Sequence, residues 1–175
     1  MSKKIAVIGG VTHGRTTLVA AIERIFGDEV EHPIDIDFAD SKTEVTFRYG
    51  GEEYTFFDFP ETEDYAENLD GTEDCAVWVI DACEGPLGGA REQLCICIEK
   101  GIENYVLFTN KCDLMDDEDL VDICEMENKE VFDEEGIFSD DVPAVRGSAR
   151  KAILDPESED GDCIRELGYI VDSLF

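Results

Sequence analysis

The feature that most constrains this chain is a glycine loop between an apolar run and an amphipathic segment. Residues 4–8 predict a short buried strand, and residues 16–26 place apolar side chains on one face of a predicted helix. The loop between them, residues 9–16, reads Gly-Gly-Val-Thr-His-Gly-Arg-Thr. It matches the pattern G-x-x-x-x-G-K-[ST] at every defined position except one, where Arg15 replaces lysine. Backbone N–H groups in such a loop suit a diphosphate, and the Thr16 hydroxyl would reach a magnesium ion.

The rest of the chain alternates predicted strands with predicted helices. Residues 43–49 and 52–57 flank Gly50-Gly51 and predict a hairpin. Further strands are predicted at 75–81, 105–109 and 142–146, and helices at 89–100, 117–135 and 164–174, with a loop at 28–42 and a weak helix at 65–69. This alternation predicts one α/β domain over residues 1–175, with a mainly parallel sheet covered by helices on both faces.

A second motif, Asn110-Lys-Cys-Asp113, follows the predicted strand 105–109. A buried Asp113 carboxylate would accept two hydrogen bonds from guanine and reject adenine, which lacks that pair of donors. The stem of Lys111 would lie over the base plane. Ser148 and Ala149, after the next predicted strand, would supply a backbone N–H to guanine O6. Three elements at the carboxyl ends of strands predict a guanine-nucleotide site.

Charge and cysteine content limit the partners. The chain carries 44 acidic and 14 basic residues, a formal charge of −30, which argues against nucleic-acid binding by this chain alone. A solvated acidic surface, salt adaptation and a basic protein partner all remain open as reasons for it. The apolar run near the N-terminus is too short for a signal peptide or a membrane span, so we expect a cytoplasmic protein without membrane contact. The seven cysteines are expected to be reduced and mostly buried, and Cys95-x-Cys97 lacks the spacing of a zinc site.

Together these motifs resemble the nucleotide-binding domain of elongation factor Tu, a translational GTPase. The likeness runs over nearly the whole chain and is strongest from residue 74 to residue 152. It is carried by the segments 12–17, 58–60, 81–86, 110–114 and 145–149. The resemblance implies a P-loop GTPase fold, with a six-stranded sheet, one antiparallel edge and about five helices, that binds GDP or GTP with magnesium. It implies that Thr12, His13, Gly14, Arg15, Thr16 and Thr17 hold the phosphates, that Asn110, Lys111, Asp113, Ser148 and Ala149 hold the base, and that Thr16 and (through water) Asp58 serve magnesium.

The departures from the family pattern lie around the terminal phosphate. Arg15 replaces the loop lysine. Glu61 stands where the family has a glycine whose N–H meets the γ-phosphate, and Thr62, the catalytic candidate, replaces the histidine that positions the attacking water. Ala39 is at about the register of the magnesium-binding threonine. We also expect the chain to lack the two β-barrel domains with which the elongation factor grips aminoacyl-tRNA.

These departures predict a guanine-nucleotide-binding protein that prefers GDP and hydrolyses GTP weakly or not at all. Two alternatives remain open. One is a competent GTPase helped by a partner protein's arginine. The other is an interaction module that keeps the fold, binds no nucleotide and engages a protein partner of the elongation factor.

Overall fold

The structure, a computed structural model, describes residues 2–27, 43–59, 68–86 and 89–175. The expected loop at 28–42 with Ala39, the positions Glu61 and Thr62, and most of the weak helix predicted at 65–69 lie outside the described residues.

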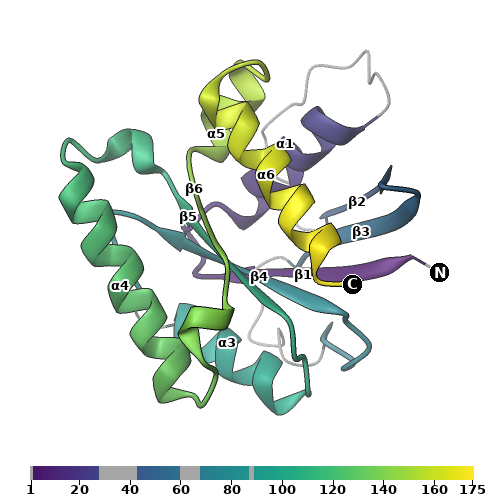
Figure 1. Cartoon of the computed structure of the whole chain (residues 1–175), viewed down its shortest axis with the longest axis horizontal. Helices are drawn as coiled ribbons and strands as arrows, with labels where there is room; N and C mark the ends of the chain where they lie inside the picture. The colour runs from purple at the N-terminus through teal and green to yellow at the C-terminus, as the bar shows by residue number, and fades with distance from the viewer. Residues whose placement is uncertain (1, 28–42, 60–67, 87–88) are drawn as a thin grey trace.

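One six-stranded sheet, in the order β2-β3-β1-β4-β5-β6, forms the centre of the described chain (Figure 1). Five of its strands run parallel: β1 (Lys3–Gly9), β3 (Glu52–Asp58), β4 (Cys75–Asp81), β5 (Tyr105–Asn110) and β6 (Ala144–Arg146). Strand β2 (Thr43–Tyr49) pairs antiparallel with β3 at one edge. The predicted fold, a mostly parallel sheet with one antiparallel edge, is confirmed.

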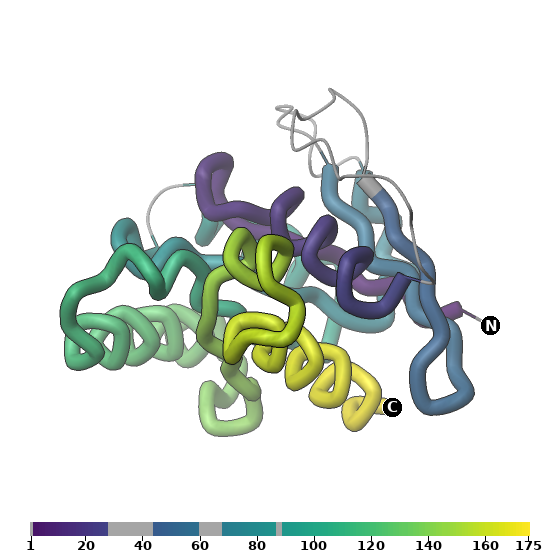
Figure 2. Tube along the Cα trace, turned by 90° about the horizontal axis from the view of Figure 1, so that it is seen from above, coloured from purple at the N-terminus to yellow at the C-terminus, as the bar shows by residue number. Residues whose placement is uncertain are grey.

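The helices divide between the two faces of the sheet. Helices α1 (Arg15–Phe26), α5 (Ala149–Leu154) and α6 (Glu159–Ser173) lie side by side on one face (Figures 1 and 2). Helices α3 (Gly89–Glu99) and α4 (Glu118–Glu134) cover the other. Strand β1 contributes side chains to both hydrophobic cores. Ile5 and Val7 pack toward α1 on one face of the sheet. Ala6 and Ile8 pack toward α3 on the other face. None of the described helices is long and apolar enough to cross a membrane.

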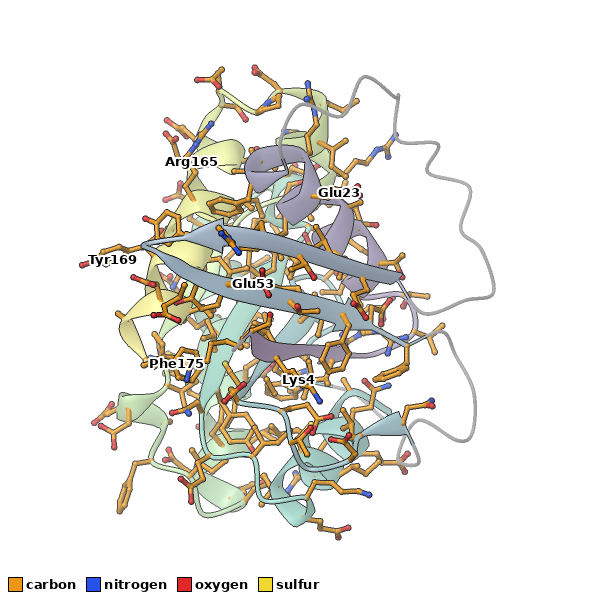
Figure 3. All side chains as sticks on the ribbon, turned by 90° about the vertical axis from the view of Figure 1, so that its right-hand side faces the viewer. Lys4, Glu23, Glu53, Arg165, Tyr169 and Phe175 are labelled. Atoms are coloured by element: carbon orange, nitrogen blue, oxygen red, sulfur yellow. The ribbon has the colours of Figure 1, made fainter. Side chains whose placement is uncertain are left out.

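The β2–β3 hairpin closes through the glycine pair that predicted it. Gly50 and Gly51 have φ angles of 62° and 98°, a region that other residues adopt only with strain. Thr46 lies opposite Thr55, and Phe47 opposite Tyr54. Figure 3 shows this hairpin, which carries Glu53, at the edge of the sheet.

The largest differences from the predicted elements occur after β5. Helix α6 begins at Glu159, five residues before its predicted start, because the Ser158 side chain accepts a hydrogen bond from the Gly161 N–H and caps it. Helix α5 was not predicted, and neither were the 3-10 turns η1 (Cys112–Leu114) and η2 (Ser139–Asp141). Strand β6 starts two residues later than predicted, just after Pro143, which has no N–H to donate to the sheet.

Candidate functional site

Parallel strand pairing brings the predicted motifs to the edge of the sheet that is formed by the carboxyl ends of its strands. Gly9, at the end of β1, pairs with Val79 of β4, and Asp81 at the end of β4 pairs with Asn110 at the end of β5. In an open α/β sheet this carboxyl-end edge is where ligands bind.

Asn110 connects the glycine loop with the loop between β6 and α5. Its side chain is buried, donates from Nδ2 to the carbonyl of His13 at 2.9 Å, and accepts at Oδ1 from the N–H of Ala149 at 3.0 Å. Gly14 makes this approach possible. It has a φ of +90°, and a Cβ at this position would lie 2.4 Å from Asn110 Nδ2. One amide side chain therefore fixes the spacing between two motifs far apart in the sequence.

Lys111 makes a second connection across the same edge. Its backbone is left-handed, with a φ of 62°, and its ammonium group donates to the carbonyl of Thr12 and forms an ion pair with Asp81 Oδ2 at 2.6 Å. The other oxygen of Asp81 accepts from the N–H of Cys83 at 2.8 Å. The side chain of Lys111 thus extends past Gly14 and leaves its stem beside the glycine loop.

His13 holds the glycine loop from inside. Its ring is buried, and Nδ1 donates to the carbonyl of Val79 at 3.2 Å because a carbonyl oxygen only accepts. Nε2 lies 3.4 Å from Glu84 Oε2. A Cβ on Gly10 would come within 2.8 Å of this ring. The side chain of His13 therefore shapes the loop, and its backbone N–H closes a turn on Gly10.

Arg15 and Thr16, at the start of α1, both turn toward Asp58 at the end of β3. Arg15 Nη1 lies 3.5 Å from Asp58 Oδ1 and donates to Gln93 Oε1 at 3.4 Å, while the Thr16 hydroxyl donates to Asp58 Oδ2. Thr16 and Asp58 offer the oxygen ligands that magnesium prefers. A fixed guanidinium beside the same carboxylate opposes a second cation, so in this arrangement these residues do not fit a magnesium ion.

The residues expected to contact the base are less buried than predicted. Asp113 is exposed, so the expectation that it is buried is wrong, because it lies in η1, beyond the end of β5. The Ser148 N–H donates to Asp160 Oδ1 at 2.7 Å, and the Ser148 hydroxyl caps α5 at Lys151. Since the Ala149 N–H already bonds to Asn110, a contact with guanine O6 from either residue would compete with a bond inside the protein.

Most of the predicted positions therefore lie at one edge of the sheet, and one lies outside the described residues. The glycine loop and the starts of η1 and α5 meet there, and Asp58 joins them through Thr16. Thr17 lies half-buried in the first turn of α1, and the catalytic candidate Thr62 is outside the described residues.

Three side chains in this region were missed by sequence reasoning. Asp81 had a signal, a carboxylate at the end of a wholly buried strand. Gln93 had none, because it lies on α3 and reaches Gly9 only through the fold, accepting from its N–H at 2.7 Å. Asp160, in the first turn of α6, likewise reaches Ser148 only through tertiary packing.

All seven cysteines are free thiols, and most of these thiols are unreactive. Burial raises the pKa of Cys97 and Cys163 to about 12 and that of Cys112 to about 11. Cys83 alone among the seven is exposed. Within the described residues, no group of three or more His, Cys, Asp or Glu side chains is placed to hold a metal ion.

The comparison with known families agrees with this geometry. Residues 2–175 match the family model of the elongation factor Tu GTP binding domain. The match extends over the glycine loop, the Asn110–Asp113 motif and the Ser148–Ala149 loop, which the structure brings to one edge of the sheet. The chain thus belongs to the elongation factor Tu GTP-binding domain family and is a guanine-nucleotide-binding, GTPase-like protein.

Proposed function

We propose that this chain binds guanine nucleotide at the edge where β1, β4 and β5 end, prefers GDP to GTP, and hydrolyses GTP slowly or not at all. The glycine loop would hold the phosphates, while Asn110, Lys111, Asp113, Ser148 and Ala149 would hold the base. The proposed location is the cytoplasm, where cysteines stay reduced.

The observation that supports this proposal most is the pair of hydrogen bonds made by Asn110. The ribose of a nucleotide limits the distance between its base and its phosphates, so the two binding loops must be held at a matching distance. Asn110 joins them directly through His13 and Ala149, and Lys111 adds the link to Thr12. Such preorganisation lowers the ordering cost that a ligand would otherwise meet on binding.

The preference for GDP rests on the residues around the terminal phosphate. Glu61 stands where the family has a glycine whose N–H meets the γ-phosphate. Thr62 replaces the water-positioning histidine. A carboxylate in that place disfavours a third phosphate by charge repulsion. A threonine hydroxyl is a poor substitute for an imidazole in positioning the attacking water.

The base specificity can be tested by calorimetric titration of the nucleotide-free protein with GDP, ADP and XDP. The native chain should bind GDP and reject ADP by at least about a hundredfold, because a site built for donor groups leaves its acceptor unpaired with adenine. Asp113→Asn should move the preference toward XDP, since an amide reverses the donor and acceptor match at that edge of the base.

Asp116→Asn is the matched control, because Asp116 is an equally exposed carboxylate three residues further along the chain. It should leave the order of affinities as in the native protein. Equal affinity of the native chain for ADP and GDP would refute the proposal.

A second candidate function is an interaction module that binds no nucleotide. It is favoured by the internal partners of the site, since Lys111 pairs with Asp81 and Thr16 hydrogen-bonds to Asp58 within the chain. Chromatography of the small molecules released from the purified, denatured protein separates the two. Recovered GDP supports nucleotide binding, and a well-folded protein that is empty and binds no added GDP supports a module for a protein partner.

A further inference from the structure

Arg15, the residue that departs from the loop pattern, is turned into the protein. Its side chain is only 4% exposed, and its Nη1 lies 3.5 Å from Asp58 Oδ1 and 3.4 Å from Gln93 Oε1. The same oxygen of Gln93 accepts the N–H of Gly9 at 2.7 Å. The guanidinium at the start of α1 is therefore positioned by side chains from β3 and α3, and α3 is itself anchored to the end of β1.

The carboxylate that Arg15 faces is engaged on both oxygens. Asp58 is 2% exposed, and its second oxygen accepts the hydroxyl hydrogen of Thr16. A buried carboxylate needs a compensating positive charge, and the Arg15 guanidinium provides one. A divalent cation between Thr16 and Asp58 would have to break their hydrogen bond and sit against that fixed charge.

We infer that the Arg15 guanidinium takes the place of the divalent cation beside Asp58, so that this chain binds a guanine nucleoside diphosphate without requiring magnesium. The inference rests on the proposed guanine-nucleotide site. Arg15 directly precedes Thr16 in the loop that would cradle the diphosphate, so its charge is already where a metal ion would bring it. A lysine there would present a compact charge on a flexible stem, without the bulkier planar group whose Nη1 approaches both Asp58 and Gln93.

The test is the dissociation constant of GDP for the nucleotide-free chain, measured by calorimetry with excess magnesium and again with EDTA. The native protein should bind GDP at least as tightly in EDTA as in magnesium, because magnesium captures free GDP that the protein binds without the metal. Arg15→Lys should restore metal dependence, with GDP binding about tenfold or more weaker in EDTA. Arg24→Lys, an exposed arginine near the other end of α1, is the matched control and should behave as the native protein does.

Electron paramagnetic resonance with Mn²⁺ and GDP gives a second readout. The native protein should release Mn²⁺ from Mn²⁺–GDP, so that the signal of free Mn²⁺ grows, whereas Arg15→Lys should broaden the signal through a ternary complex. A native protein that loses tenfold in GDP affinity with EDTA overturns the inference and leaves the proposed function standing. Metal independence that persists in folded Arg15→Lys overturns the role of Arg15. Absence of GDP binding in both buffers refutes the proposed function itself, and with it this inference. The native comparison decides even if the variant does not fold.

Discussion

Glu61 is the single residue on which the preference for GDP is expected to depend most. Two unit charges ~4 Å apart repel by roughly 4 kcal/mol at an effective dielectric constant of 20. Because solvent and counterions screen the two charges, we expect only about 1–2 kcal/mol against GTP, or ~5–30-fold in affinity. Glu61→Gly should reduce this difference, and dissociation constants for GDP and GTP measure it directly. Hydrolysis should stay slow in the variant, because Thr62 is unchanged.

Glu103→Gly is the control for this comparison. Glu103 is an exposed acid just before β5, at the edge of the sheet opposite the site, so its loss changes net charge equally without altering the site. If the native protein binds GDP and GTP equally, or if Glu61→Gly leaves their ratio as it was, Glu61 is not the discriminating residue.

At the scale of elements, the start of α6 depends on Gly161. A Cβ at this position would lie 2.0 Å from the carbonyl oxygen of Pro156, a backbone atom that cannot move without shifting the turn. Gly161→Ala should therefore destabilise the protein by about 1–3 kcal/mol, measured by urea denaturation, in spite of the better helix propensity of alanine.

Gly89→Ala separates this clash from the general effect of adding a methyl group to a helix. Gly89 begins α3 and would place its Cβ in open space, so the variant should be as stable as the native protein, within about 0.5 kcal/mol, or slightly more stable. Equal stability of the two variants would show that the turn before α6 adapts to a side chain.

How far the sequence predicts an element depends on where its stability comes from. Strands β4 and β5 were predicted within one residue because each is an unbroken apolar run, buried throughout. The first turn of α6 was missed because its residues are acidic rather than periodic, and its stability comes from the Ser158 cap and the helix dipole. Helix α5 has only six residues, too few to show a period.

The same distinction applies to the site. The loop residues and the Asn110–Asp113 motif were predictable, since their backbone requirements impose local patterns. The inward direction of Arg15 was not, because it depends on Gln93 and Asp58, which are distant in the sequence.

At the scale of the whole molecule, the charge of −30 places acidic side chains close to one another. Several basic residues offset acids locally, as Arg146 does by pairing with Asp122 and Glu125 on α4. The remaining repulsion should weaken with salt, because the Debye length falls from about 10 Å at 0.1 M to about 3 Å at 1 M. We therefore expect Tm to rise with KCl, by roughly 2–4 °C for each kcal/mol of repulsion relieved in a chain of this size.

The way in which Tm depends on KCl concentration identifies the cause of the increase. Screening is nearly complete once the Debye length is shorter than the spacing of the charges, so Tm should level off before about 1 M KCl. Exclusion of sucrose from the protein surface provides the contrast, since its effect continues to grow with concentration. A Tm that is flat from low to high KCl would mean that the acidic residues are too well hydrated to repel one another measurably.

The exposure of Cys83 makes the native chain a ready-made carrier for a covalent fluorophore. A maleimide dye should attach at this residue first, beside Asp81 and the 3-10 turn that carries Asp113, because the other thiols are buried or half-buried. Partial burial and the charge of Asp81 raise the pKa of the Cys83 thiol, so labelling should accelerate as the pH is made more alkaline and more thiolate forms. Mass spectrometry should find one dye on the folded protein and seven after denaturation. Emission from that dye would then report the arrival of a nucleotide without any engineered cysteine.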